Sequence, residues 1–587
     1  MATLSETPAE ALARLRAVVA RDPRNAPAWR MLGRALRAAG EESEAAEAEM
    51  TAVRATAFEP EMVAIAGAML ANDLPRAEAG LRARLKAQPT DAAAIRLMAE
   101  LAARIGRYGD AETLLRRALE LAPGFAVARA NLALVLNRQQ RYAEALAELD
   151  ALSLSGGDAQ DASANAMLRA AVLGRTGDYE EAATLYAQLV QAFPRHARMW
   201  MSYGHVLKTI GRQDEAIAAY RTAIACQGDL GEVWWSLANL KTVRFDDADV
   251  AAMEQALAGD PEPTEEDRLH LHFALGKAYG DRDEPEPSFR HYAQGNALRS
   301  AQLGYDPAGV AAQVDQAIAT FTPAFFAARA GQGDPAPDPV FVLGLPRAGS
   351  TLVEQILSSH SQVEGTMELP DIPALALREA RAMGSPRDWI AASAKMRPEQ
   401  LAALGAEFLE RTRVQRKTGK PFYIDKLPNN WVYAGFIHLI LPNAKIVDAR
   451  RHPLDCCFSN FRQHFAKGQA FAYDLAHIGR YYADYVRAMD HLDRVLPGRV
   501  HRVIHERLLE DPEAEVRALL AYLGLPFEEA CLAFHANTRA VRTASSEQVR
   551  RPINRDGVDA WRPYEKWLDP LKHALGDVTE SYASNRV

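Results

Sequence analysis

The chain has 587 residues, of which 48% are hydrophobic and 25% are charged, so it has enough apolar sequence for two or more packed domains. Its formal net charge of −8 argues against a general nucleic-acid binder and against a protein that binds anionic membranes. The four cysteines (Cys226, Cys456, Cys457 and Cys531) have neither the spacing of a disulfide framework nor that of a metal site.

The start of the chain, MATLSETPAEALARL, is acidic and amphipathic, whereas a signal peptide begins basic and continues apolar. No apolar run approaches the ~20 residues that cross a bilayer. We therefore expect a protein of the reducing cytoplasm without a membrane segment.

Residues 1–300 are rich in alanine and leucine, and they repeat with a period near 34 residues. The clearest copy is Trp200-x-x-Tyr203-Gly204-x-x-Leu207, and Trp234 follows Trp200 after 34 residues. Further copies align on Trp29, Val63, Ile95, Arg129, Ala166 and His272. This period, with small residues in fixed columns, is the tetratricopeptide signature and predicts a solenoid of paired antiparallel helices. Such a solenoid exposes a concave surface, so we expect a protein or peptide partner on residues 1–300.

Residues 301–338 lose the period and end in a stretch rich in Gly, Pro and Asp, which predicts an exposed linker. Strand and helix signals alternate in residues 339–587, as in a parallel α/β sheet. We expect strands at 340–345, 421–426, 444–451 and 500–505. The predicted fold is an α solenoid followed by a P-loop-like α/β domain with a parallel sheet.

The first of these strands runs into the loop Gly344-Leu-Pro-Arg-Ala-Gly-Ser-Thr-Leu352 and then into a helix for which Ser350 is a plausible N-cap. A strand, a glycine loop and a helix start direct several backbone N–H groups at one anion. A Walker A loop would need lysine at position 350, and the loop's only cation is Arg347. A P-loop kinase is therefore the less favoured alternative.

The loop GLPRAGSTL, followed by Glu368, resembles the 5′-phosphosulfate-binding loop of the sulfotransferase superfamily, and it is most similar to the tyrosylprotein and Golgi-type branch. The resemblance extends from Val340 to the C-terminus. It implies 3′-phosphoadenosine 5′-phosphosulfate as the donor. It also implies a donor loop formed by Arg347, Ala348, Gly349, Ser350, Thr351 and Leu352.

The segment Arg451-His-Pro-Leu-Asp-Cys-Cys-Phe-Ser459 resembles the family's 3′-phosphate motif, with Arg451 and Ser459 as the contacts. The late segment 543–550 and Trp561 resemble the part that closes over the same phosphate, which implies contacts from Ser545 and Arg551. Two positions depart from the family pattern: His505 replaces a tyrosine, and Ala560 replaces a lysine. The candidates to replace the missing lysine are Arg550, Arg551 and Arg562.

The resemblance also implies the catalytic residues. Glu368 stands where the tyrosylprotein branch has its base, Lys426 resembles the strand-end lysine that contacts the bridging oxygen, and Arg347 shares that work. His360 and His452 are the other candidate bases, and we expect both to be structural. No cluster of His, Cys and Asp has ligand spacing, so we expect in-line transfer without a metal.

The sequence thus predicts a cytoplasmic sulfotransferase that moves a sulfuryl group to a hydroxyl of a protein tyrosine, a sugar or a metabolite. The alternatives are an inactive nucleotide-binding scaffold and, less favoured, a P-loop kinase.

Overall fold

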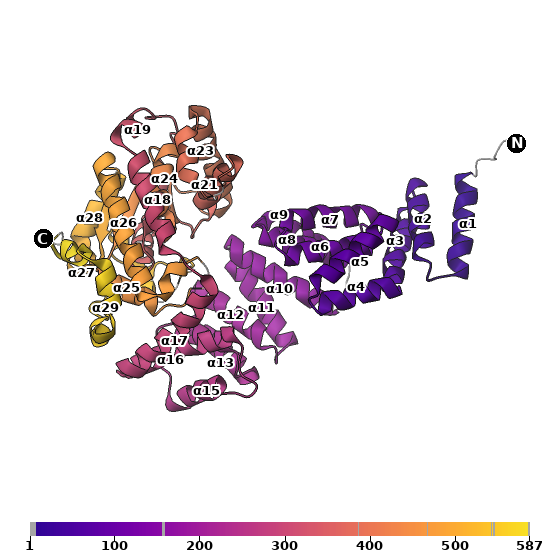
Figure 1. Cartoon of the computed structure of the whole chain (residues 1–587), viewed down its shortest axis with the longest axis horizontal. Coiled ribbons are helices and arrows are strands. Elements are labelled where there is room, and N and C mark those ends of the chain that lie inside the picture. Colours follow the sequence, from indigo (N-terminus) through magenta and orange to yellow (C-terminus); the bar gives the residue numbers. More distant parts are fainter. Residues whose placement is uncertain are drawn as a thin grey trace. The chain divides into compact units, whose positions relative to one another are not determined.

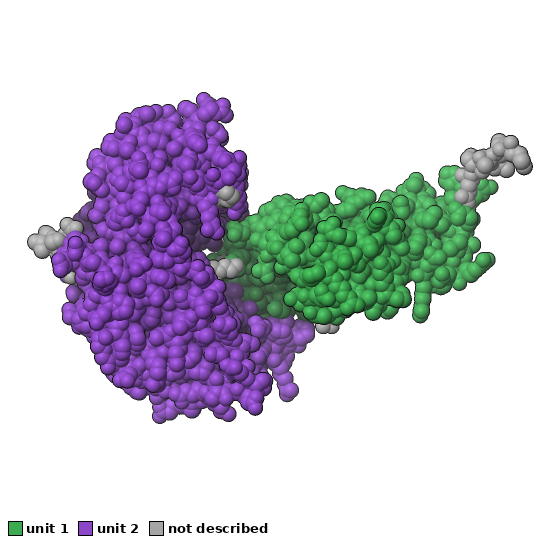
Figure 2. Space-filling model, in the orientation of Figure 1, with its two compact units in different colours: residues 1–189 green, residues 190–587 purple. Residues whose placement is uncertain are grey.

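The computed structural model describes residues 7–154, 159–385, 387–465, 468–541, 543, 546 and 548–584. The chain divides into two compact units, residues 1–189 and residues 190–587, which are coloured separately in Figure 2. This division falls within the repeats, so the last repeats belong to the same compact unit as the parallel sheet.

The described part of the first unit is helical (Figure 1), and helices of neighbouring number pair as the repeats predict. Its helices are α1 (Pro8–Arg21), α2 (Ala26–Ala38), α3 (Glu42–Ala57), α4 (Pro60–Leu70), α5 (Leu74–Ala87), α6 (Ala92–Arg104), α7 (Tyr108–Leu121), α8 (Ala126–Arg138), α9 (Tyr142–Leu154), α10 (Ala159–Thr176) and most of α11 (Tyr179–Ala192).

The repeats continue into the second unit with α12 (Ala197–Ile210), α13 (Gln213–Cys226), α14 (Gly231–Ala238), α15 (Asp247–Leu257), α16 (Glu265–Gly280) and α17 (Pro285–Leu303). The small residues of the repeat columns lie where two helices touch. Ala45, Ala111 and Ala216 are fully buried. A Cβ on Gly204 would lie 2.6 Å from the ring of Tyr220, so only glycine allows α12 to approach α13 this closely. The predicted solenoid is therefore confirmed.

The sheet of the second unit has five parallel strands in the order β2-β3-β1-β4-β5. These are β1 (Pro339–Gly344), β2 (Val363–Gly365), β3 (Phe422–Lys426), β4 (Lys445–Arg450) and β5 (Val500–Ile504). All six residues of β1 are buried, because a central parallel strand is covered on both faces. The parallel sheet is confirmed, and β2 is a short edge strand that the sequence pattern did not indicate.

Helices and 3₁₀ turns surround the sheet. They are α18 (Pro307–Thr320), α19 (Pro323–Ala327), α20 (Ser350–Ser358), α21 (Asp371–Ala382), α22 (Trp389–Lys395), α23 (Pro398–Thr412), η1 (Arg413–Gln415), η2 (Pro428–Tyr433), α24 (Ala434–Ile440), α25 (Pro453–Phe461), η3 (Ala470–Tyr473), α26 (Leu475–Val495), α27 (His505–Glu510), α28 (Pro512–Leu523), η4 (Glu529–Cys531), η5 (Phe534–Ala536), η6 (Gln548–Arg550), η7 (Arg562–Trp567), α29 (Asp569–Leu575) and α30 (Val578–Ser584).

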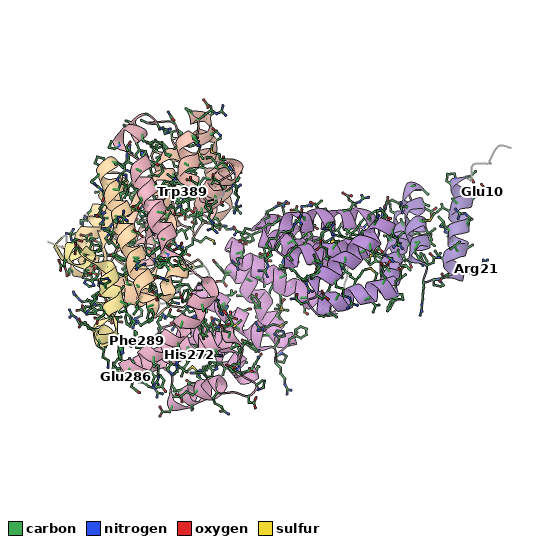
Figure 3. The ribbon with its side chains drawn as sticks, viewed as in Figure 1. Glu10, Arg21, His272, Glu286, Phe289 and Trp389 are labelled. Atoms are coloured by element: carbon green, nitrogen blue, oxygen red, sulfur yellow. The ribbon has the colours of Figure 1, made fainter. Side chains whose placement is uncertain are left out.

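The segment 301–338, expected to be an exposed linker, carries α18 and α19 and contributes to the core. Phe321 and Phe326 are buried, and the ring of Phe321 lies 6.0 Å from that of Trp389, which Figure 3 labels. The expectation of a linker rests on the Gly/Pro-rich stretch near residue 335. The apolar residues that pack into the core, Phe321 and Phe326, lie before that stretch. The domain limits 1–300, 301–338 and 339–587 stay a prediction.

The last repeats and the sheet share one hydrophobic core. Phe289 of α17, also labelled in Figure 3, stacks on Trp567 with ring centroids 4.9 Å apart. Nearby, Ser288 and Tyr564 share a hydrogen bond of 3.0 Å between their hydroxyl oxygens, and the Asn296 amide donates to the carbonyl of Phe461 at 2.8 Å. These contacts join segments more than 160 residues apart within the second unit.

We expect a truncated protein of residues 193–587 to fold, and one of residues 332–587 to aggregate, because the shorter piece exposes the apolar surface that α17 covers. Size-exclusion chromatography and a thermal melt of both proteins test this expectation. A soluble 332–587 protein with a cooperative melt would instead support the predicted boundary at residue 338.

Among the described residues, no helix combines the length and the apolar character that crossing a membrane requires.

Candidate active site

The predicted site residues meet at one edge of the sheet. Arg347 follows β1, Glu368 follows β2, Lys426 ends β3, and Arg451 follows β4. Because the strands are parallel, their carboxyl ends lie on the same edge, and the chain turns to opposite sides of β1 there. Ligands of open α/β sheets bind at this kind of switch point.

The loop after β1 is shaped by three residues with positive φ angles: Gly344 (139°), Arg347 (67°) and Gly349 (97°). A Cβ on Gly344 would lie 2.3 Å from the carbonyl oxygen of Ala449, so β1 and β4 require glycine at this position. The N-cap of α20 is Gly349 and not Ser350, which is the first helical residue. This corrects the expected cap: the left-handed turn at Gly349 starts the helix one residue earlier. The first N–H groups of α20 therefore face the loop, where they can bind an anion.

Arg347 joins the loop to the Arg451–Ser459 segment. Its Nε donates to the Ser459 hydroxyl at 3.0 Å, and its carbonyl accepts from Arg451 Nη1 at 3.2 Å. Burial, with the Arg451 and Arg462 guanidinium groups nearby, lowers the pKa of Arg347 to about 10. The two predicted phosphate motifs thus form one cationic site, although they are about 100 residues apart in sequence.

Glu368 and Lys426 form an ion pair at the site. Lys426 Nζ lies 2.5 Å from Glu368 Oε1, and the lysine side chain is 1% exposed while that of Glu368 is 44% exposed. The lysine also lies 3.9 Å from Glu354, which Arg539 binds at 2.7 Å. The buried lysine is therefore held in place, and the carboxylate of Glu368 remains accessible. Glu354 and Arg539 carry no motif, and the sequence analysis missed them.

Arg451 and Ser459 are both buried, at 8% exposure each. Arg451 Nη2 donates to the carbonyl of Gly557, and its buried Nε has no hydrogen-bond partner. The partnerless Nε of a buried guanidinium suits an anionic ligand at this position.

Only part of the late segment lies at the site. Ser545 lies outside the described residues. Arg551 lines the site and lies 3.7 Å from Asp556. Arg550 instead donates to the carbonyl of Thr209 in α12, and Arg562 pairs with Asp559 at 3.1 Å. Of the three arginines considered as replacements for the missing lysine, only Arg551 lines a cavity of the site.

Three cavities meet at Arg347, and each is named here by one of its residues. The Glu368 cavity has a volume of about 480 Å³, and Lys426 also lines it. The His505 cavity (about 120 Å³) lies over Gly349 and Arg451, and the Lys241 cavity (about 440 Å³) contains Arg451 and Ser459. Burial, with Arg451 nearby, lowers the pKa of His505 to about 4, so the imidazole is neutral near pH 7.

The repeats form one wall of the Glu368 cavity. The same cavity that the loop lines is also lined by His205 and Lys208 of α12, Trp235 of α14 and His270 of α16. The repeat pattern explains why these helices form, and it gives no sign that their side chains face a reaction centre.

His360 and His452, the alternative bases, line none of the three cavities. His360 is buried, with Nε2 3.0 Å from the carbonyl of Pro526 and 3.3 Å from Glu528. Both histidines are thus placed away from the Glu368–Lys426 pair.

One group of possible metal ligands was not expected from the sequence. The ligand atoms of Glu266, His270 and His464 lie within 4.8 Å of one another. Arg299 already pairs with Glu266 at 3.2 Å and would repel a cation, so we assign this group no metal.

This fold and this edge define a class: an α/β domain with a P-loop-like anion site and a lysine–carboxylate pair at the carboxyl ends of its strands. Comparison with models of known protein families identifies both parts of the chain. Residues 339–529 match the sulfotransferase family, and residues 5–60, 102–171 and 167–229 match tetratricopeptide repeats. The chain therefore combines tetratricopeptide repeats with a sulfotransferase-family domain.

The chain is similar to two proteins of other organisms. An uncharacterized protein of Aquifex aeolicus is 32% identical over 418 residues, which cover 70% of this chain and 54% of that relative. The chain thus spans about half the length of this relative. Protein-tyrosine sulfotransferase A of Caenorhabditis elegans is 23% identical over 249 residues, which cover 38% of this chain and 60% of the nematode protein.

Among solved structures, the sulfotransferase domain from the curacin biosynthetic pathway is 20% identical, with a TM-score of 0.31, and the match covers 43% of this chain and 98% of that domain.

Proposed function

We propose that this protein transfers a sulfuryl group from 3′-phosphoadenosine 5′-phosphosulfate to a hydroxyl acceptor. One observation supports this most. Around Arg347, the loop after β1 lies together with the Lys426–Glu368 ion pair and with the two residues of the 3′-phosphate motif, Arg451 and Ser459. A donor with a phosphosulfate at one end and a 3′-phosphate at the other needs two anion sites, and the two groups of cations around Arg347 match that need.

The chemistry follows from the placement of these groups. The acceptor oxygen attacks sulfur, the bond between sulfur and the bridging phosphate oxygen breaks, and Glu368 takes the acceptor proton. Lys426 and Arg347 neutralise the charge that develops on the leaving oxygen. No step requires a metal.

We propose that the acceptor reaches Glu368 through the Glu368 cavity. Because α12, α14 and α16 form its wall, the acceptor touches the repeats while it reacts. This favours a protein or peptide acceptor, such as a tyrosine, over a sugar or a small metabolite. We also propose a cytoplasmic location, and the four unpaired cysteines support it because reducing compartments keep thiols free.

Nucleotide binding tests the donor. We expect 3′,5′-adenosine bisphosphate to raise the melting temperature far more than AMP or ATP, because a ligand at a hundredfold excess over its Kd stabilises the fold by about 2.7 kcal/mol. Differential scanning fluorimetry with each nucleotide measures the shift. Equal shifts for ATP and the bisphosphate would refute the proposed donor and favour the kinase alternative.

The Arg451→Ala variant should lose most of the difference between the bisphosphate and AMP, because it removes a charge-assisted contact to the 3′-phosphate. The matched control is Arg494→Ala, which removes an exposed arginine of α26 outside the three cavities. Unchanged discrimination in the Arg451→Ala protein would place the 3′-phosphate elsewhere.

A further inference from the structure

The Lys241 cavity carries more positive charge than its own carboxylates can neutralise. Five arginines and two lysines line it, against the two aspartates Asp281 and Asp556. Among the described residues, no carboxylate lies within ion-pair distance of Lys241, Arg451 or Arg462. The two aspartates of the cavity pair with other cations, Asp281 with Lys277 and Asp556 with Arg551. Such an excess in a cavity of about 440 Å³ is costly unless an anion enters it.

Lys241 reaches this cavity because one repeat departs from the regular pattern. The first helices of other repeats, such as α2 and α12, have 13 and 14 residues, whereas α14 has 8. The chain leaves α14 at Ala238 and turns at Lys241, whose φ of 68° lies in the left-handed region. Other repeats have a left-handed residue in the same turn, such as Gln140 and Gly211, so this conformation belongs to the repeat, and the earlier end of α14 is the feature that is particular to Lys241.

Gln463 holds the lysine beside the phosphate motif. Its Oε1 accepts from Lys241 Nζ at 3.0 Å, and its Nε2 donates to Asn239 Oδ1 at 3.2 Å. Gln463 is 2% exposed and lies two residues after the end of α25, the helix that carries Ser459. These hydrogen bonds therefore join the turn after α14 to the residues that follow α25, the helix whose Ser459 accepts from Arg347.

We propose that Lys241 is part of the binding site for the donor's 3′-phosphate, together with Arg451 and Ser459, so that a repeat supplies one of the donor's contacts. This inference rests on the proposed function. It makes the last repeats part of the donor site and not only a surface for a partner.

Placing a lysine in this cavity costs folding free energy. Burial and the surrounding cations Arg347, Lys277, Arg462 and Lys208 hold the pKa of Lys241 well below its usual range. A lysine whose pKa falls on folding destabilises the fold at every pH below its unfolded pKa. A lysine that serves binding should therefore give opposite effects on the stability of the empty protein and on its affinity for an anion.

The test compares Lys241→Met, which keeps an unbranched side chain without the charge, with Lys241→Arg, which keeps the charge. We expect Lys241→Met to raise the melting temperature of the protein without ligand. In calorimetric titrations, its affinity for 3′,5′-adenosine bisphosphate should fall about 10-fold, and its affinity for AMP should stay within twofold of the wild type. Lys241→Arg should restore most of the bisphosphate affinity. Lys395→Met, an exposed lysine at the end of α22, should change none of these values.

Proton uptake gives a second readout. At pH 8 a phosphate is fully ionised, so protons taken up on binding report on the protein. An arriving phosphate favours the charged form of Lys241, and titrations in buffers of different ionisation enthalpy should show an uptake in the wild type that shrinks in Lys241→Met.

Each outcome separates the two proposals. Wild-type protein that binds AMP and the bisphosphate equally would refute the proposed donor. Wild-type protein that prefers the bisphosphate, with Lys241→Met keeping that full preference, would overturn only the role of Lys241. An equal loss of affinity for both nucleotides, or a lower melting temperature of Lys241→Met without ligand, would show that the lysine is structural and would also overturn its proposed role in binding.

Discussion

Replacing Glu368 with glutamine is expected to lower the single-turnover rate of transfer by about 10²–10⁴, which is the usual contribution of a general base. The amide keeps the shape of the side chain and can still accept from Lys426 Nζ, 2.5 Å away in the wild type, but it cannot take the acceptor proton. Affinity for the bisphosphate should barely change, because Glu368 lines neither the His505 cavity nor the Lys241 cavity. Transfer from radiolabelled donor to hydroxyl acceptors in a cell extract measures the rate.

The matched control is Glu399→Gln, which neutralises an exposed glutamate at the start of α23 and should leave the rate unchanged. Near wild-type turnover in the Glu368→Gln protein would contradict the assignment of the base. A loss of nucleotide binding would instead make Glu368 a structural residue.

Replacing Lys426 with alanine is expected to lower the rate by about 10²–10³, the usual cost of losing one group that stabilises the developing charge. Unlike Glu368→Gln, it should also weaken donor binding and lower the melting temperature. The lysine is 1% exposed. Among the described residues, Glu354, which is 2% exposed, then keeps Arg539 as its one charged partner. The same transfer assay, a bisphosphate titration and a thermal melt measure the three effects.

Lys420→Ala is the control for Lys426. Lys420 precedes the same strand and donates to the carbonyls of His360 and Val363 at 3.1 Å each, outside the three cavities. It should affect stability without a comparable loss of rate. If Lys426→Ala binds the donor and turns over like the Lys420→Ala protein, the leaving oxygen is stabilised elsewhere.

The sequence indicated the loop and the repeats because their signals are local. A strand that ends in Gly344, a turn at Gly349 and a helix at Ser350 follow from neighbours in the chain, and so do alanines that recur where two helices touch. The parallel order of strands then places Arg347, Lys426 and Arg451 on one edge, because every such strand ends on the same side of the sheet.

The tertiary structure alone decided what the last repeats do. Phe289 stacks on Trp567, and Lys241 donates a hydrogen bond to Gln463, 222 residues further along the chain and just after α25. A period of 34 residues reports how each helix packs against the next, and it carries no information about a second domain that packs against α14, α16 and α17. By itself the sequence therefore determined the class of both parts and the residues of the loop. The wall of the Glu368 cavity, the cations of the Lys241 cavity and the place where the chain divides depend on contacts between distant segments, which only folding creates.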